Sequence, residues 1–259
     1  MNANSIFPIP ALDDNYIWCL HHEGDAVVVD PGDPQPVADA LRTWGLRLRG
    51  ILVTHHHYDH IDGIPGLLAA FPGIAVYGPD DVRAHGVTRT VGEGARIRLD
   101  APPIDMRVMA LPGHTRSHIA WCGGGVLFCG DVLFSAGCGR VFEGTMETMA
   151  ASLDRIAALP PETLVYCAHE YTLDNLGFAR WVEPDSPALA RREAEAKRLR
   201  AAGRPTVPTT LALERETNPF LRTRTPAVKA AAERHAGHPL DTPAAVFAEL
   251  RQWKDREYD

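Results

Sequence analysis

Four side chains that commonly bind metal ions fall within six residues, directly after a short apolar run. The run, residues 50–53, is typical of a buried strand, and the candidate ligands after it are His55, His57, Asp59 and His60. Alternate residues of an extended segment point to the same side, so His55 and His57 can hold one ion while His56 faces away. If the chain turns into a helix near residue 61, Asp59 and His60 lie past the bend and suit a second, adjacent ion. The stretch predicts a dinuclear metal site of the kind that hydrolases use.

Three further candidate ligands each follow a predicted strand. They are His114 after residues 106–111, Asp131 after residues 126–129 and His169 after residues 163–167. Loops at strand ends are held by a rigid sheet, which is why binding sites are commonly built there. A glycine precedes both His114 and Asp131, and it lets the backbone bend sharply and approach a ligand closely. We therefore expect all three side chains to join the histidine cluster.

The seven ligands divide between two ions. We expect His114 to give the first ion a third imidazole, and His169 to join Asp59 and His60 at the second. Asp131 can bridge both ions with its two oxygens. Imidazole and carboxylate ligands without a thiolate suit zinc, and also iron or manganese. The sequence thus predicts two divalent ions per chain, and the ligand types alone leave zinc, iron and manganese open.

The remaining histidines are interpreted without a metal role, because an isolated histidine is usually a surface or structural residue. They are His21, His22, His56, His85, His118, His235 and His238. Of these, His118 is expected to support the ligands rather than to act as an eighth one.

The order of predicted elements indicates an α+β chain in two parts. Strands are predicted at residues 16–20, 26–29, 74–77, 96–99, 106–111, 118–122, 126–129 and 163–167, and helices at 34–44, 61–70 and 145–159. Thr145 is a plausible N-cap of the last of these helices. Beyond Tyr171 no convincing strand appears, and helices are predicted at 172–182, 186–202, 211–217, 226–236 and 243–255. We therefore expect a domain of strands and helices over residues 1–170 and a smaller helical domain over 171–259.

Composition limits the partners and the compartment. The 259 residues carry a formal net charge of −7, which argues against nucleic-acid binding and means that an anionic substrate needs a local basic patch. The five cysteines are odd in number and scattered, which suits a reducing compartment better than a disulfide framework. Residues 1–10 lack the features of a signal peptide, and no apolar run is long enough to span a membrane. We expect a cytoplasmic monomer with no nucleic-acid or membrane partner.

The ligand motifs resemble the signature of the metallo-β-lactamase superfamily: T-H-x-H-x-D-H, then P-G-H-T, G-D and a late histidine. Within that superfamily the chain resembles the glyoxalase II (hydroxyacylglutathione hydrolase) family. The additional matches are residues 14–18, 136–140, 142–145, 167–172 and 216–222, and a closing helix with Arg251 and Lys254. The resemblance implies an αββα sandwich followed by an all-helical domain that helps to bind glutathione.

The activity implied by this resemblance is hydrolysis of S-2-hydroxyacylglutathione thioesters. The main substrate would be S-D-lactoylglutathione, cleaved to glutathione and D-lactate in methylglyoxal detoxification. Coordination lowers the pKa of water to about 7, so a hydroxide bridging two metals is an available nucleophile at neutral pH. Asp59 and Asp131 could orient it. The thiolate leaving group has a parent pKa of roughly 8.5, so no dedicated general acid is needed.

The substrate contacts are also implied by the resemblance. Arg251 and Lys254 would hold the glycyl carboxylate, and they are three residues apart, hence on one face of a helix. Without the resemblance, a solvated terminal helix would be the simpler interpretation of this pair. Tyr171 would offer its hydroxyl to the tripeptide backbone, and Arg140 would lie beside the cysteinyl portion. Arg140 and Phe142 replace the lysine and tyrosine of some family members, which changes the donor geometry and removes a hydroxyl.

Two other functions remain open at this point. A persulfide dioxygenase of the same superfamily shares much of the ligand pattern but typically lacks the helical C-terminal domain. A regulatory metal-binding protein that has lost catalysis is the other alternative, although it would have no need to retain the full ligand set and the substrate contacts.

Overall fold

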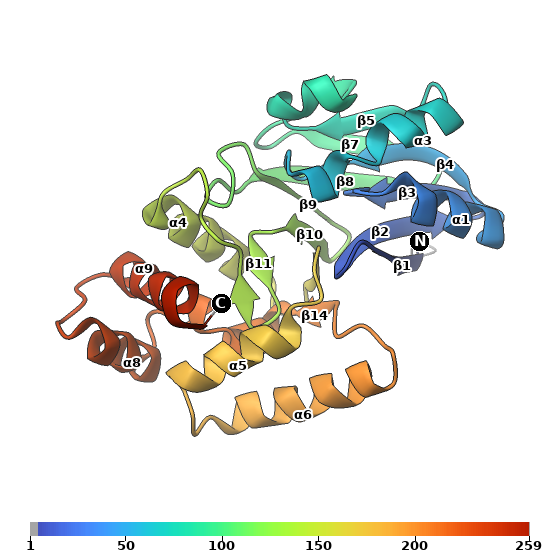
Figure 1. Cartoon of the computed structure of the whole chain (residues 1–259). Coiled ribbons are helices and arrows are strands. Elements are labelled where there is room, and N and C mark those ends of the chain that lie inside the picture. The colour runs from blue at the N-terminus through green and yellow to red at the C-terminus, as the bar shows by residue number, and fades with distance from the viewer. Residues whose placement is uncertain (1–4, 259) are drawn as a thin grey trace. The chain divides into compact units, whose positions relative to one another are not determined.

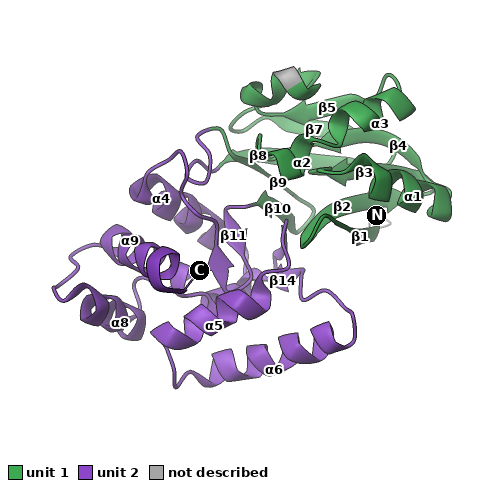
Figure 2. Cartoon of the chain, in the orientation of Figure 1, with its two compact units in different colours: residues 1–110, 117–130 green, residues 111–116, 131–259 purple. Residues whose placement is uncertain are grey.

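The computed structural model describes residues 5–258, which form two compact units (Figures 1 and 2). Unit 1 contains residues 1–110 and 117–130, and unit 2 contains residues 111–116 and 131–259. The prediction that residues 1–10 hold no signal peptide falls partly on residues 1–4, outside the described range. The predicted domain boundary after residue 170 would separate a catalytic domain from a helical domain that helps to bind glutathione. It stays a prediction.

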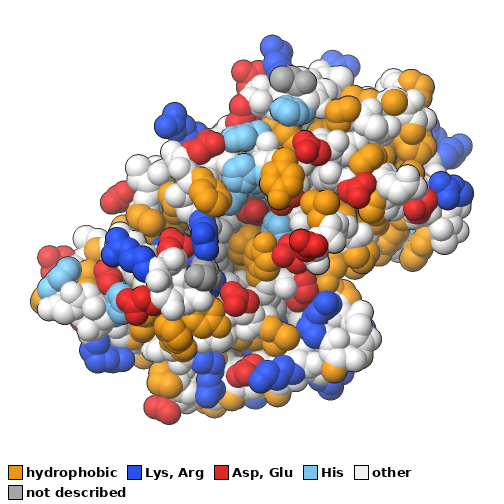
Figure 3. Space-filling model, viewed as in Figure 1, with side chains coloured by type: hydrophobic (Ala, Val, Ile, Leu, Met, Phe, Trp, Pro, Cys, Tyr) orange, Lys and Arg blue, Asp and Glu red, His pale blue; other side chains and the backbone are white. Residues whose placement is uncertain are grey.

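Charges of both signs share the surface. On the face drawn in Figure 3, Lys and Arg side chains are interspersed with Asp and Glu.

Among residues 5–258, no helix combines the length and the apolar character that crossing a membrane requires.

Unit 1 holds a six-stranded sheet whose strands follow one another in chain order (Figure 1). The strands are β1 (Ser5–Ala11), β2 (Asn15–His22), β3 (Asp25–Val29), β4 (Arg47–Leu52), β5 (Ala75–Gly78) and β6 (Arg89–Thr90). Strands β1 to β3 are antiparallel, and β3 to β6 are parallel. Parallel neighbours need crossovers, which are provided here by α1 (Pro34–Trp44), by α2 (Tyr58–Ile61) with α3 (Ile64–Ala70), and by the 3₁₀ turn η1 (Asp80–His85).

A second, antiparallel sheet completes unit 1 in the order β10-β9-β8-β7. Its strands are β7 (Arg96–Leu99), β8 (Ile104–Ala110), β9 (Ile119–Gly123) and β10 (Val126–Gly130). The indole of Trp121 on β9 is fully buried and donates to the Val53 carbonyl oxygen just after β4, over 3.2 Å. This bond ties the second sheet to the end of the strand that leads into the histidine cluster.

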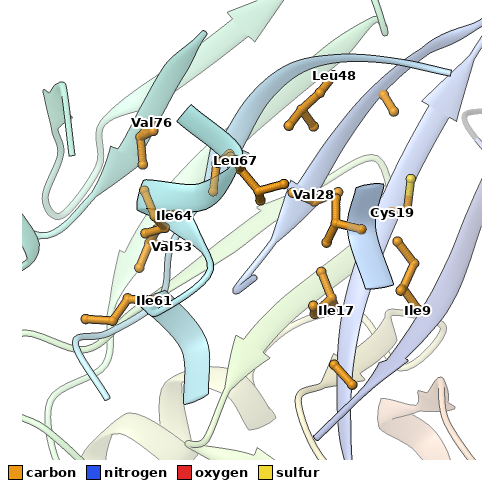
Figure 4. Packing of buried hydrophobic residues seen from close by; sticks show 14 of the residues in the cluster. Ile9, Ile17, Cys19, Val28, Leu48, Val53, Ile61, Ile64, Leu67 and Val76 are labelled. Carbon is orange, nitrogen blue, oxygen red and sulfur yellow. The ribbon is translucent and has the colours of Figure 1, made fainter. Parts of the chain in front are cut away.

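The core of unit 1 lies between the first sheet and its helices (Figure 4). Ile64 and Leu67 of α3 pack in one cluster with Ile17, Val28 and Ile51 of the sheet. Residues that alternate with these along the strands, such as Val27 and Val29, are also fully buried, so both faces of the sheet are covered.

Unit 2 is mainly helical. Its helices are α4 (Met146–Ala157), α5 (Thr172–Val182), α6 (Pro187–Ala201), α7 (Leu211–Thr217), α8 (Pro226–Ala236) and α9 (Pro243–Trp253), with the 3₁₀ turn η2 (Pro219–Leu221) and the π-helical turn η3 (Lys254–Tyr258). Two antiparallel strand pairs accompany them: β11 (Leu133–Phe134) with β12 (Gly137–Cys138), and β13 (Leu164–Cys167) with β14 (Thr209–Thr210). Thr145 caps α4, as predicted, by accepting a hydrogen bond from the backbone of Thr148.

Three differences from the sequence predictions stand out, and the first two have clear physical causes. The helix expected at 61–70 divides into α2 and α3, because the Gly63 N–H donates to the Pro31 carbonyl oxygen at 2.9 Å instead of to the preceding turn, and Pro65 at the start of α3 has no N–H to donate. Strand β1 was not predicted, since it contains Pro8 and Pro10, which cannot donate to a ladder and are tolerated only at a sheet edge. The two-residue strand β14 shows that the expectation of no strand beyond Tyr171 was wrong.

Replacing Ile51 by alanine should test how far the β4 core holds unit 1 together. Ile51 is fully buried, so Ile51→Ala should lower the free energy of unfolding by about 2–5 kcal/mol through the cavity it leaves. The control Ile51→Val should cost about 0.5–1.5 kcal/mol. Urea titrations at one fixed metal concentration give both values, because bound metal raises apparent stability. Equal losses in the two variants would contradict tight packing at this position.

Candidate metal centre and adjoining cavity

In unit 1, the histidine cluster lies on the irregular segment between β4 and α2. The ring nitrogens His55 Nε2 and His57 Nδ1 face each other at 3.0 Å. His56 turns elsewhere, and its Nδ1 is 2.8 Å from an Asp81 carboxylate oxygen. Extended backbone thus places the first and third histidines on one side and the second on the other.

Asp59 and His60 lie on the short helix α2, past the bend. Asp59 Oδ2 is 3.3 Å from His60 Nε2, and it accepts a hydrogen bond from Asn15 Nδ2 at 3.0 Å. His60 Nδ1 donates to Asp30 Oδ2 at 3.1 Å, so Nε2 is the nitrogen left to bind a metal. The structure therefore presents two pairs of ligand atoms in unit 1.

A buried carboxylate that the sequence analysis missed, Asp30, orients this cluster. Its two oxygens accept hydrogen bonds from the Thr54 N–H and hydroxyl, each over 2.7 Å. Since the Thr54 hydroxyl gives its only proton to Asp30, it must accept from His55 Nδ1, which lies 3.0 Å away. His55 therefore keeps its lone pair on Nε2, the atom that faces His57. One signal was present: Asp30 directly follows the apolar strand β3, as Asp131 follows β10.

His118 also supports the cluster from within unit 1. It is fully buried, and its ring stacks on that of His55 with 4.7 Å between centroids. Gly130, at the end of β10, lies so close that an added Cβ would be 2.7 Å from His118 Nε2 and 2.4 Å from Thr54 Oγ1.

In unit 2, Asp131 lies between two histidines. Its Oδ2 is 3.5 Å from His114 Nε2 and 3.4 Å from His169 Nε2. His114 Nδ1 donates to the Arg140 carbonyl oxygen at 2.8 Å, which again leaves Nε2 as the metal-binding nitrogen. Close backbone packing supports this arrangement, because a Cβ at Gly139 would lie 2.0 Å from the Asp131 carbonyl oxygen.

The donor atoms in each unit fit metal coordination. Ligand atoms around a tetrahedral zinc, with bonds of 2.0–2.2 Å, lie about 3.3–3.6 Å apart. The facing atoms in the two units are 3.0–3.5 Å apart. All are imidazole nitrogens or carboxylate oxygens, a donor set that suits a divalent cation. Hydrogen bonds to the far nitrogens of His55, His60 and His114 give these rings the orientation typical of metal ligands.

A cavity of about 470 Å³ in unit 2 adjoins the Asp131 group. It is lined by His114, Asp131, Phe134, Cys138, Gly139, Arg140, Phe142, Tyr171, Asp174, Asn175, Arg251 and Lys254. All five residues expected to contact a substrate are therefore on its wall: Arg140, Phe142, Tyr171, Arg251 and Lys254. The volume lies within the range of roughly 300–1,000 Å³ that is usual for small-molecule sites.

Three cations of this cavity are held by acidic partners. Arg251 is only 1% exposed, and it donates to Asp255 Oδ1 at 2.8 Å and to the Cys138 carbonyl oxygen at 3.0 Å. Lys254 Nζ is 3.2 Å from Asp174 Oδ2, and Arg140 Nε is 3.6 Å from Asp255 Oδ1. Instead of the solvated face expected of an ordinary terminal helix, α9 and η3 thus carry buried positive charge to the cavity.

Aromatic rings surround the ligands of unit 2. Tyr171 stacks on His169 with 4.7 Å between centroids, and Phe134 meets both rings edge-on. Phe142 meets His114 edge-on at 5.3 Å and is 62% exposed, an unusual position for an apolar side chain.

The cavity cysteine is not a nucleophile at neutral pH. Burial raises the pKa of the Cys138 thiol to about 11. The thiol therefore stays protonated, and the reactive form of cysteine is the thiolate.

Comparison with known proteins places the fold and the ligand motifs in a superfamily. A model of the metallo-β-lactamase superfamily matches residues 12–169, and a model of the hydroxyacylglutathione hydrolase C-terminus matches residues 170–257. These matches define the class: a metallo-β-lactamase fold followed by a helical C-terminal domain, which confirms the predicted fold class.

Relatives of known family narrow the class further. The hydroxyacylglutathione hydrolase of Alkalilimnicola ehrlichii is 53% identical over 253 residues, covering 97% of this chain and 98% of that protein. The hydroxyacylglutathione hydrolase of Cupriavidus taiwanensis is 52% identical over 259 residues, covering 96% and 97%. The chain belongs to the hydroxyacylglutathione hydrolase family.

Solved structures agree on the fold. ETHE1 from Myxococcus xanthus is 22% identical with a TM-score of 0.67, covering 98% of this chain and 92% of that one. Another solved structure, in a di-iron-bound form, is 27% identical with a TM-score of 0.60. The match covers 83% of this chain and 100% of the other chain.

Removing the Asp30 carboxylate should weaken metal binding in unit 1. In Asp30→Asn an amide N–H₂ replaces one of the oxygens that accept from Thr54 and His60, so the rings of His55 and His60 lose their orientation. We expect a 10- to 100-fold loss of metal affinity, of the order seen when such supporting groups are changed. Competition with a chromophoric chelator measures it. The exposed control Asp39→Asn on α1 should bind as the wild type does, and an Asp30→Asn protein that did so too would contradict this role.

Proposed function

We propose that this chain hydrolyses S-2-hydroxyacylglutathione thioesters, chiefly S-D-lactoylglutathione, to glutathione and D-lactate. One observation carries the proposal. The carboxylate of Asp131 faces His114 and His169. Asp131 and His114 lie on the wall of the cavity that Arg140, Arg251 and Lys254 also line. A hydrolytic centre and a binding site for carboxylates thus share one space, as a peptide thioester requires. The names of the relatives support the same activity.

We propose that the ligands of the two units form one dinuclear site. The chain passes between the units at residues 110–111, 116–117 and 130–131, so each passage lies beside a ligand. Asp131 is bonded directly to Gly130, which in unit 1 packs against Thr54 and His118. His114 is three residues from Ser117 of unit 1. His114 and Asp131 are thus within three residues of unit 1 along the chain, and this closeness in sequence supports the proposal of a shared site.

The metal ions of this site would be zinc by first choice. A solved relative in a di-iron-bound form, 27% identical, keeps iron as an alternative. When bound, two divalent ions would supply an acidified water at neutral pH and Lewis-acid polarisation of the thioester carbonyl. Asp59 and Asp131 would orient that water by accepting its hydrogen bonds. The departing thiolate needs little protonation, because its parent pKa is roughly 8.5.

The substrate would be held by the cations of unit 2. Glutathione carries two carboxylates, and a chain of net charge −7 must attract them locally. Lys254 and Arg251 line the cavity with donors that can turn from Asp174 and Asp255 to a glycyl carboxylate. The Tyr171 hydroxyl would bind the tripeptide backbone, while Arg140 would lie beside the cysteinyl portion. Phe142 offers an apolar contact where some family members have a hydroxyl.

The helical C-terminal part favours the hydrolase over its rivals. Residues 170–257 match the hydroxyacylglutathione hydrolase C-terminus, which a persulfide dioxygenase would not be expected to carry. A regulatory protein without catalysis would have no need for a complete ligand set beside a cationic cavity. We further propose that the protein acts as a monomer in the cytoplasm, consistent with its five free cysteines.

Hydrolysis should be measurable directly, and it should depend on bound metal. Loss of the thioester absorbance of S-D-lactoylglutathione, followed with metal analysis of the same sample, should show turnover in the metal-loaded protein. A chelator should abolish it, and added zinc should restore it. Absence of turnover with any thioester would contradict the proposal, and oxygen uptake with glutathione persulfide would support the dioxygenase instead.

Removing the Lys254 charge should weaken substrate binding more than catalysis. Lys254→Met keeps the apolar stem and loses an ammonium that is worth about 1.5–3 kcal/mol when it binds a charged partner, so KM should rise at least about tenfold with little change in kcat. Arg251→Ala should raise KM too, and it should also lower stability because Arg251 is buried against Cys138. The control Arg256→Met on the same turn should keep the wild-type KM. An unchanged KM in Lys254→Met would remove this residue from the site.

A further inference from the structure

The hairpin β11–β12 in unit 2 connects the metal ligand Asp131 with the substrate cavity. Leu133 pairs with Cys138 and Phe134 with Gly137, and a two-residue turn joins the strands. At its base the Asp131 carbonyl lies against Gly139. The chain then reaches Arg140, whose carbonyl oxygen accepts the His114 hydrogen bond. A shift of this hairpin would therefore move a metal ligand, the partner of another ligand and a cavity cation together.

The turn of the hairpin has a conformation that alanine does not favour. Ala136, the second of the two turn residues, has φ +59°. Turns that need positive φ there usually carry glycine or asparagine, because a Cβ is strained in the left-handed region. The turn therefore needs support from outside the hairpin.

Glu214 on α7 provides that support from a fully buried position, 0% exposed. Its Oε2 accepts from the Ala136 N–H at 2.7 Å, and its Oε1 accepts from the Ser135 hydroxyl at 2.9 Å. Arg192 Nη2 lies 3.2 Å from the Ser135 hydroxyl oxygen. Because arginine can only donate, the hydroxyl accepts from Arg192 and gives its own proton to Glu214. The result is a charge-assisted chain from Arg192 through Ser135 to Glu214.

Two amide side chains hold the rest of the turn. Asn218 Nδ2 is within hydrogen-bonding distance of Glu214 Oε2 at 3.1 Å and of the Phe134 and Gly137 carbonyl oxygens at 3.1 and 2.9 Å. Asn175 Nδ2 donates to the Ser135 carbonyl oxygen at 3.2 Å. Asn175 also packs so closely that a Cβ at Gly137 would be 2.3 Å from its amide carbon. Three helices of unit 2, α5, α6 and α7, thus bind one short hairpin through buried polar groups.

We infer that Glu214 is a positioning residue: its carboxylate holds the β11–β12 turn, and through the hairpin it sets the position of Asp131 and of the Cys138–Arg140 segment. This inference rests on the proposed function for its kinetic readout. Glu214 lies outside the motifs that carry the family resemblance, and it touches neither a ligand nor the cavity. Its contribution is the conformation of the turn.

Glu214→Gln tests the inference with little change in size. The amide replaces one acceptor by a donor, so it cannot accept from both Ser135 and Ala136. We expect kcat/KM for S-D-lactoylglutathione to fall about tenfold, with weaker metal binding, as for other groups that support a ligand. Two controls separate this effect from lost charge and lost stability. Glu193→Gln removes a half-buried carboxylate that pairs with Lys197, and Val228→Ala removes buried volume on α8. Both variants should keep the wild-type kcat/KM when they are assayed at a temperature well below the one at which they unfold.

A second substitution should restore part of the loss if the turn is the cause. Glycine adopts positive φ without strain, so Ala136→Gly lowers the need for the Glu214 bonds. The double variant Glu214→Gln/Ala136→Gly should recover at least about threefold in kcat/KM over Glu214→Gln. If Glu214→Gln does not fold, Ser135→Ala takes its place, since it removes one bond to the carboxylate and should lower kcat/KM about threefold.

The outcomes separate this inference from the proposed function. Wild-type activity with unchanged kinetics and metal affinity in Glu214→Gln would overturn the positioning role alone. A loss in Glu214→Gln that Ala136→Gly does not reduce would also overturn it. If the wild type hydrolyses no thioester, the proposed function fails, and metal affinity of the same variants, measured by chelator competition, still decides the positioning role.

Discussion

The orientation of imidazole rings by hydrogen bonds to their far nitrogens is the interaction on which the rest of this site depends. Asp30 accepts hydrogen bonds from the Thr54 hydroxyl and from His60 Nδ1, and the Thr54 hydroxyl oxygen in turn accepts one from His55 Nδ1. The Arg140 carbonyl does the same for His114. In each ring Nδ1 is thereby committed as a donor, and Nε2 keeps the lone pair that a cation needs. Without these acceptors, the same histidines could rotate, or could present the other nitrogen to a cation.

A second feature of the site is that a candidate metal ligand and the wall of the cavity share structural elements in unit 2. Asp131 opens the segment that continues as β11 and β12, and the same segment ends at Arg140 on the wall of the cavity. Buried groups from three helices hold its turn, among them Glu214 and Asn218. The helical part of the chain thus contributes more than the cations on α9 and η3. It also holds the turn of the hairpin that follows Asp131, a candidate metal ligand.

Local sequence signals predicted much of the secondary structure, because they act over a few residues. The helices α1, α5, α7 and α8 begin and end where the apolar spacing and the proline and glycine positions predict. Predictions were wrong or incomplete where a distant partner decides the conformation. A helix divides at Gly63 because its N–H donates to the Pro31 carbonyl oxygen, and β1 is a strand despite two prolines because it lies at the edge of its sheet. The supporting residues Asp30 and Glu214 were missed for the same reason, since their bonds join positions 24 to 79 residues apart.

The sequence alone determined which side chains could bind metal, since a histidine or aspartate directly after an apolar strand is legible in the order of residues. It also determined the fold class and the family, through motifs that extend over nearly the whole chain. Only the tertiary structure decided which nitrogen of each ring is available, which acidic groups hold Arg251 and Lys254, and that the expected substrate contacts line one cavity. The physical reason is the separation along the chain over which each kind of interaction acts. Propensity and alternation are properties of neighbours in the chain, whereas hydrogen-bond partners and cavity walls come from segments that meet only when the chain has folded.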